Sequence, residues 1–244
     1  MRGLTTAALL ELWERGRALP QVRRAFALLQ AACPETPADV LMSWTVGQRD
    51  AYLFTLRERT LGPDLEARTA CPACAAALEM KFQISDLRSP SREAPRAVYS
   101  LYRDGQEVHF RLPTLRDLDD LGKRNDRAQA RQQLLQACIL KTLHEGAERP
   151  VELLSDEILH EVEQGMAQAD PQADVRLDLT CAACGHRWET PFDIVAFLWS
   201  EIHAHAQRLL SEVHQLASAY GWSETDILAL SPLRRFLYLE LVGA

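Results

Sequence analysis

The chain has 244 residues, of which 47% are hydrophobic and 25% are charged, proportions typical of a globular protein with a sizeable core. Its formal net charge of −7 argues against broad binding to nucleic acid, because such binding depends on neutralising phosphates. Acidic residues follow the start too closely for a signal peptide and no apolar run reaches membrane-spanning length, so we expect a cytoplasmic protein with reduced thiols and no membrane partner.

Residues 1–63 predict a helical region. Apolar residues recur at helical spacing three times, and Gly62-Pro63 is a stop signal at the end of the third stretch. Ser43 or Thr45 is placed to cap the last of these helices. The three expected helices cover residues 4–16, 22–32 and 46–61.

Two C-x-x-C pairs form the most informative motif of the chain. Each pair can present two thiolates from one tight turn, which is half of a tetrahedral zinc site. The flanks after the pairs match at a constant offset of 110 residues (78 to 188, for example), and residues 78–84 alternate like a half-buried strand. The repeat predicts a structural zinc site shared by two distant segments. The expected ligands are Cys71, Cys74, Cys181 and Cys184.

Other uses of the pairs have less support. A redox motif would need a βαβ context, and haem attachment needs a histidine where Gly185 stands. A structural disulfide is disfavoured by the absence of a secretory segment. His186 is an alternative zinc ligand in place of one cysteine. Cys33 and Cys138 are isolated, and we interpret Cys33 as a small core residue.

The cysteine motifs define a second region, residues 64–193, which we expect to be a zinc ribbon carrying an insertion over about residues 88–170. The insertion should begin with a β-hairpin over 98–113, whose Asp104-Gly105 turn suits positive φ. We expect three helices after this hairpin. Their signals are a Thr114/Asp117 capping pair, a periodic stretch over 127–143 and a cap at Ser155. A strand over 175–179 then leads into the second C-x-x-C pair.

Residues 194–244 predict a C-terminal helical region. Its first helix is the longest of the chain and runs from Ile194 to Tyr220, with Gly221 in the C-cap role. Two shorter helices follow, starting after Ser223 and at Pro232. The whole pattern predicts a mostly helical α+β protein with a discontinuous four-cysteine zinc ribbon and a β-hairpin insertion. No nucleophile elbow, P-loop or dinucleotide motif occurs, so we expect no enzyme.

The C-terminal third also carries a recognisable pattern. Its segments are residues 197–203, residues 212–217, residues 220–231 and Arg234-Arg235-Phe236-Leu237-Tyr238-Leu239. The Val46-Gly47-Gln48-Arg49-Asp50 segment, Phe110-Arg111-Leu112-Pro113-Thr114 and both cysteine pairs look similar too. Together they resemble the baseplate hub assembly chaperone family of T-even-like contractile phages, which is common in gene clusters for phage tails and contractile injection systems. The resemblance is firmest over the last 70 residues.

This resemblance implies a non-enzymatic protein that helps to build the baseplate hub and binds hub or other tail proteins. Short phage relatives can lack the cysteines, so zinc would be a structural feature of a subgroup. Whether the protein stays in the finished particle is left open. Aromatic and arginine side chains often dominate interfaces, and they gather near the C-terminus. The candidate partner-binding residues are Tyr220, Trp222, Ile227, Leu230, Arg234, Arg235 and Tyr238. Packing of the last helices on the long one explains these residues equally well.

Two rival functions remain at this point. A nucleic-acid-binding zinc ribbon would need a basic face, and the basic residues near the cysteine pairs are few and mixed with acids. They are Arg68, Lys81, Arg176 and Arg187. A redox or metal-dependent enzyme would need an open metal position or a reactive thiol, whereas four cysteines close the coordination sphere.

Overall fold

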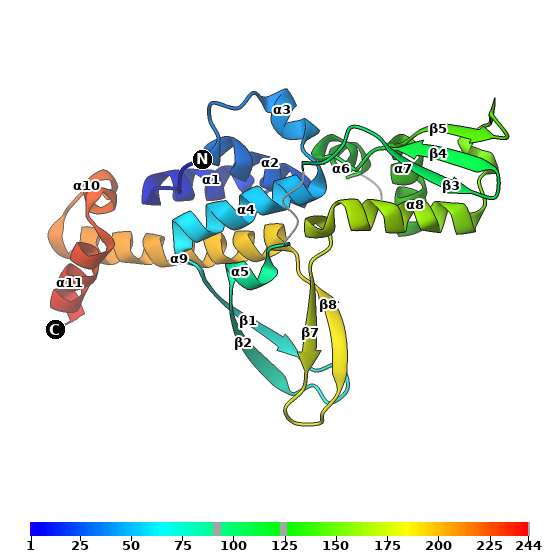
Figure 1. The fold of residues 1–244 in the computed structure, drawn as a ribbon. Helices are drawn as coiled ribbons and strands as arrows, with labels where there is room; N and C mark the ends of the chain where they lie inside the picture. The colour runs from blue at the N-terminus through cyan, green and yellow to red at the C-terminus, as the bar shows by residue number, and fades with distance from the viewer. Residues whose placement is uncertain (90–93, 123–125, 244) are drawn as a thin grey trace.

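The structure is a computed structural model that describes residues 1–89, 94–122 and 126–243 (Figure 1). Helices from both ends of the chain build its larger core, in which α1, α2 and α4 pack on α9. The helices of this main body are α1 (Thr6–Gly16), α2 (Gln21–Ala32), α3 (Ala38–Ser43), α4 (Val46–Leu61) and α9 (Ile194–Tyr220). The sequence predicted α1, α2, α4 and α9, whereas α3 was not among the three helices expected in residues 1–63.

Local signals set the bounds of α4. The Thr45 side chain accepts a hydrogen bond from the backbone N–H of Gln48, and the Gln48 side chain accepts one from the backbone N–H of Thr45, which completes a capping box. At the other end, the buried Arg57 donates to both carboxylate oxygens of Glu201 on α9 and to the carbonyl of Gly62. These contacts fix the point at which the chain leaves the main body.

Two antiparallel hairpins project together from one side of the main body (Figure 1). The first hairpin is β1 (Asp64–Ala70) with β2 (Ala77–Gln83), and the second is β7 (Arg176–Thr180) with β8 (Arg187–Pro191). Each hairpin leads directly into a helix: α5 (Ile84–Leu87) follows the first and α9 follows the second. The predicted repeat of strand and C-x-x-C turn is therefore confirmed, and each copy is followed by the start of a helix. The sequence suggested that the first of these strands continues to Ile84, but Ile84 is the first residue of α5.

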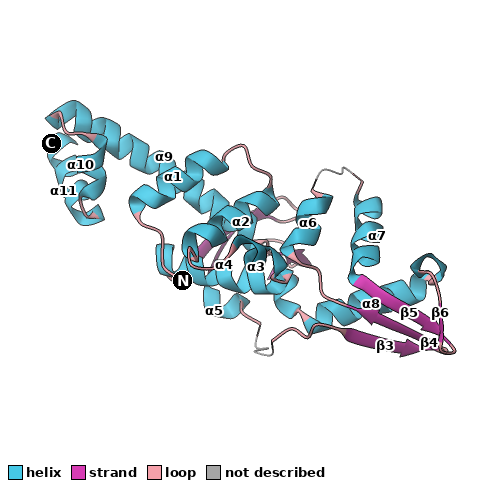
Figure 2. Cartoon of the chain, turned by 90° about the horizontal axis from the view of Figure 1, so that it is seen from above, coloured by secondary structure: helices cyan, strands magenta, loops and turns pink. Residues whose placement is uncertain are grey.

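The chain between the hairpins forms a second unit with its own core. A four-stranded antiparallel sheet packs against helices at the end of the molecule opposite to the C-terminus (Figure 2). The strands are β3 (Tyr99–Arg103), β4 (Gln106–Phe110), β5 (Ile139–His144) and β6 (Ala147–Glu148). The helices are α6 (Leu115–Leu121), α7 (Arg127–Cys138), η1 (Val151–Leu153), α8 (Asp156–Ala169) and η2 (Pro171–Ala173). The α+β class and the expected insertion are thus observed, but the hairpin is part of a larger sheet.

The helix predicted over 127–143 is wrong in its second half. It ends at Cys138, and Ile139–His144 becomes a strand paired with β4. Apolar residues at 139 and 143 fit helical spacing, but Ile139 and Thr142 are β-branched and suit a pleated surface. The free edge of β4 supplies the ladder, with Thr142 opposite Val108, and this long-range pairing overrides the local period.

The insert contacts the main body at several places. Thr45 and Thr114 form an isolated β-bridge, and Leu115 of α6 is buried in the larger core. The carboxylate of Asp170, at the end of α8, accepts a hydrogen bond of 2.9 Å from the backbone N–H of Gly47 in the first turn of α4. The buried Gln172 donates to the carbonyl of Leu87 and accepts from the backbone N–H of Ser89. A Cβ atom at Gly47 would lie 1.8 Å from a carboxylate oxygen of Asp170, so glycine is required for this approach.

The last helices are α10 (Glu224–Ala229) and α11 (Pro232–Gly243), which pack near the end of α9 beyond the main body (Figures 1 and 2). Gly221 takes the left-handed conformation that the sequence predicted for the C-cap of α9. In the described part of the chain, no helix is both long and apolar enough to span a membrane.

Candidate metal centre

Both C-x-x-C turns fold by the same backbone hydrogen bonds at the tips of the hairpins. In the first, the N–H of Cys71 donates to the carbonyl of Ala76 and the N–H of Ala75 donates to the carbonyl of Cys71. In the second, the N–H of Cys181 donates to the carbonyl of His186 and the N–H of Gly185 donates to the carbonyl of Cys181. Each turn points its two thiols toward the other hairpin, so the repeat in sequence is a repeat in local structure.

One position in each turn has a left-handed backbone. It is Ala75 with φ of 58° in the first turn and Gly185 with φ of 73° in the second. Glycine adopts this region without strain, whereas an alanine there costs about 1–2 kcal/mol. The first turn therefore carries local strain that the second turn avoids.

The four thiols gather into one group. Sγ of Cys71 lies 3.7 Å from Sγ of Cys184, Sγ of Cys74 lies 3.7 Å from Sγ of Cys181, and all four sulfurs lie within 4.8 Å of one another. A tetrahedral zinc ion with Zn–S bonds of about 2.3 Å holds its sulfurs about 3.8 Å apart. A disulfide requires about 2.05 Å. The donor set therefore fits a four-thiolate metal site.

The pKa values of the cysteine thiols also favour a bound cation. A hydrogen bond from the backbone N–H of Cys184 lowers the pKa of the Cys181 thiol to about 7. At Cys184 the backbone N–H of His186 lowers the pKa, but the neighbouring Cys74 thiol and burial oppose this and raise it to about 12. One thiolate thus forms readily while its neighbours resist further negative charge. A divalent cation would relieve this repulsion and allow all four sulfurs to bind as thiolates.

The alternatives for the site find no support in the geometry. The ring of His186 stacks on Trp188, with centroids 5.8 Å apart, and is not part of the group of metal-ligating atoms found among the described residues. Cys33 lies in the larger core and Cys138 in the smaller one. Burial raises the pKa of Cys138 to about 11, as expected for an unreactive core thiol.

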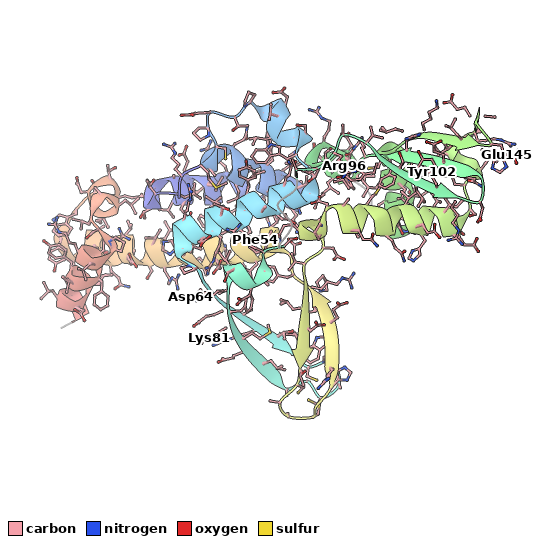
Figure 3. All side chains as sticks on the ribbon, in the orientation of Figure 1. Phe54, Asp64, Lys81, Arg96, Tyr102 and Glu145 are labelled. Atoms are coloured by element: carbon pink, nitrogen blue, oxygen red, sulfur yellow. The ribbon has the colours of Figure 1, made fainter. Side chains whose placement is uncertain are left out.

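The surface near the cysteines offers no basic face for nucleic acid. Three of the four cations named above are paired with acids, and Arg187 is exposed with no ion pair among the described contacts, which leaves little net charge to attract phosphates. The ion pairs are Arg68–Glu79 at 2.9 Å, Lys81–Glu66 at 2.7 Å, and Arg176 with both Asp174 and Glu189 at 2.9 Å. Lys81, labelled in Figure 3, projects from the first hairpin into solvent with its side chain 78% exposed.

The predicted partner-binding residues divide into two groups. Tyr220, Trp222 and Tyr238 form a ring cluster, with Tyr220 and Trp222 stacked at 4.7 Å and Tyr238 at 4.9 Å from Trp222. Ile227 is fully buried, and Arg235 is 3% exposed. The expectation that Arg235 faces a partner is wrong, because its guanidinium donates to Glu212 on α9 and to the carbonyl of Leu230.

Much of the exposed surface of α11 is apolar, although the charged Arg234 and Glu240 are exposed as well. Leu233 is 65% exposed, Phe236 56%, Leu237 49% and Leu241 67%. Their spacing of three and four residues places them on one stripe, opposite to the face that carries Arg235. The signal was present in the sequence, since apolar residues outnumber charged ones in α11 and occur on more than one side of the helix, although Glu240 lies within the stripe. Arg234 is exposed beside this stripe and Leu230 is half-buried.

Fold and site together define a class: a mostly helical α+β protein in which a paired-hairpin cysteine site interrupts a helical body. A comparison with protein families matches residues 23–199 to the family of the T4 bacteriophage base plate protein. The chain belongs to this T4-like base plate family. The match covers most of α2, then α3, α4, both hairpins and the insert, and it ends within the first turns of α9, so that α1 and most of α9 lie outside it. No curated protein and no solved structure matches the chain.

The matched region differs from the region in which the resemblance was firmest. Most of the residues quoted from the C-terminal third lie beyond residue 199, outside the match. Both cysteine pairs lie inside it. The family is therefore confirmed, and the support for it comes from the main body and the hairpins.

Proposed function

We propose that the protein is a non-enzymatic assembly factor or component of the baseplate hub of a contractile phage tail or contractile injection system, where it binds other baseplate proteins. Membership of the base plate family carries this proposal. The described residues add a cysteine group that fits closed metal coordination, which gives no open position for a substrate. In this proposal the protein acts in the cytoplasm and is retained in the assembled particle.

The proposal includes one structural zinc ion bound by Cys71, Cys74, Cys181 and Cys184. Support comes from the sulfur spacing and from the topology, since the two hairpins form separate sheets with no ladder between them in the described residues. Zinc would join their tips. Purified protein should contain about one zinc per chain, and a chelator should lower the thermal midpoint and speed amide exchange in both hairpins more than in α2. Metal-free protein after preparation under reducing conditions without chelators would contradict this.

For the partner-binding surface we propose the C-terminal tip, with the apolar stripe of α11 in place of the buried Arg235. Aromatic residues beside it, Tyr220 and Trp222, are partly exposed and held in place by the ring cluster. Exposed contiguous apolar surface is unusual on a protein without partners. A hub protein with an apolar groove would fit this stripe.

The test is a charged substitution on the stripe with a matched control elsewhere. The double variant Leu233→Glu/Leu237→Glu should reduce the number of complete tails counted by electron microscopy at least tenfold, because a buried interface charge without a partner strongly weakens binding. Leu153→Glu is the control, since Leu153 is 63% exposed on the insert. Circular dichroism checks folding of both variants. Normal tail numbers from the folded double variant would reject this surface.

A further inference from the structure

A groove of about 470 Å³ lies between the two hairpins. On one side it is lined by consecutive residues of the second hairpin, 174–179, and on the other by the alternating Met80 and Phe82 of the first. Successive strand residues point to opposite faces, so a consecutive lining marks the edge of a strand and an alternating lining marks a face. The edge of β7 therefore lies over the apolar face of β2, and Figure 1 shows β7 as the strand of the second hairpin nearer to the first.

The backbone of β7 has unused hydrogen-bonding groups on this edge. The ladder to β8 is bounded by the bond from the N–H of Cys181 to His186 and the bond from Phe192 to the carbonyl of Val175. Antiparallel pairs alternate, so the odd-numbered residues of β7 bond to β8, while Arg176, Asp178 and Thr180 direct their N–H and C=O groups away from it. Among the described residues no other strand pairs with this edge.

The side chains of this strand are unbalanced in charge. Asp178 is exposed and lies directly opposite Glu189 in the ladder, an arrangement of like charges that is destabilising. The nearby Arg176 is already shared between Glu189 and Asp174, with 2.9 Å to each. Among the described contacts Asp178 forms no ion pair, and the next cation on the same face of the ladder is Arg187, opposite Thr180.

In the first hairpin, the equivalent ladder position carries two residues of opposite charge. At the repeat offset, Asp178 corresponds to Arg68 and Glu189 to Glu79. Arg68 and Glu79 face each other in the ladder and form an ion pair of 2.9 Å. The two copies of the hairpin therefore differ in charge at this ladder position: the first has an ion pair where the second has two acidic residues.

From these observations we propose that an extended segment of a partner protein, in which apolar residues alternate with basic ones, adds as a third strand to the edge of β7. Its backbone would pair with Arg176, Asp178 and Thr180. Its apolar side chains would cover Met80 and Phe82 in the groove, and a lysine or arginine would lie beside Asp178. Strand addition of this kind takes its affinity from backbone hydrogen bonds and its specificity from the alternating side chains.

This inference adds a binding site to the proposed function. It rests on the proposed function only in taking the partner segment from another baseplate protein. It can be tested on the purified full-length chain with a probe peptide of eight residues in which Val and Lys alternate. At saturation the peptide should slow hydrogen exchange at the amides of Arg176, Asp178 and Thr180 at least tenfold, measured by NMR. A peptide in which Val and Glu alternate should bind at least tenfold more weakly, because it adds a third negative charge.

A charge reversal makes the test specific. Asp178→Lys should abolish the preference, so that the Val/Lys and Val/Glu peptides bind with similar affinity, because the introduced lysine and Glu189 would together carry no net charge. The variant should fold, because the introduced ammonium group would face Glu189 as a favourable pair. Arg68→Glu is the matched control on the first hairpin and should keep the wild-type preference. The proposal is overturned if neither peptide slows exchange at the three amides, or if Asp178→Lys leaves the preference unchanged. These results do not depend on the tail counts that test the proposed function.

Discussion

At the scale of single residues, the repeat of the cysteine turns explains which positions matter for folding. Equivalent positions at the 110-residue offset have the same backbone conformation even where the residue differs, as at Ala75 and Gly185. The sequence predicted the cysteines because metal ligands have a recognisable spacing. It could not predict that Ala75 is strained, because a positive φ at a non-glycine residue has no signature in residue type.

This difference leads to a prediction on stability. Ala75→Gly should raise the free energy of unfolding by about 0.5–1 kcal/mol, since relief of the left-handed strain exceeds the added chain entropy of glycine. Gly185→Ala should lower it by a similar amount. Both can be measured by denaturant unfolding of the metal-loaded protein. Ala73→Gly is the control: its φ is not positive, so it should gain nothing. Equal effects of glycine at 73 and 75 would contradict the strain argument.

At the scale of elements, local signals predicted helices well and failed where distant pairing decides. The bounds of α4 and α9 follow from caps and stop signals at Thr45, Gly62 and Gly221. By contrast, β5 forms because β4 offers an edge to it, and no local pattern over 139–144 encodes that edge. The same limit applied to α11, where residue types alone could not tell which face meets α9.

The contacts that hold α11 on α9 lead to a prediction, and the neighbouring residue provides a control variant. Arg235→Ala should lower the free energy of unfolding by about 1–3 kcal/mol and loosen α11, because it leaves Glu212 and the carbonyl of Leu230 without their donor. Arg234→Ala, one residue earlier and exposed, should change stability by less than about 0.5 kcal/mol. Hydrogen exchange in α10 and α11 measures the effect. Similar results from the two variants would mean that the buried contacts of Arg235 do not fix the helix.

At the scale of the whole molecule, two cores are connected by polar contacts, by backbone bonds between residues 44–46 and 113–115, and by Leu115 of α6, which is buried in the larger core. The main body and the insert each have a cluster of buried side chains. From the sequence we expected an insert between the two cysteine motifs, because these motifs frame it. It gave no indication of the junction, which depends on Asp170 and Gln172, polar residues that look like ordinary surface positions in the sequence. Buried polar contacts of this kind are only visible once distant segments have been brought together.

The junction makes a prediction about cooperativity. In the double variant Asp170→Ala/Gln172→Ala, the N–H of Gly47 and the carbonyl of Leu87 lose their partners, which should cost about 2–4 kcal/mol at the contact between the units. Since each unit keeps its own core, and since Leu115 and the backbone bonds at residues 44–46 still join them, we expect both units to stay folded, with a calorimetric transition that is broader and lower in midpoint than that of the wild-type chain. Asp174→Ala is the control, because Asp174 is exposed and pairs only with Arg176 in the described contacts. A single transition with an unchanged midpoint in the double variant would show that Asp170 and Gln172 do not couple the two cores.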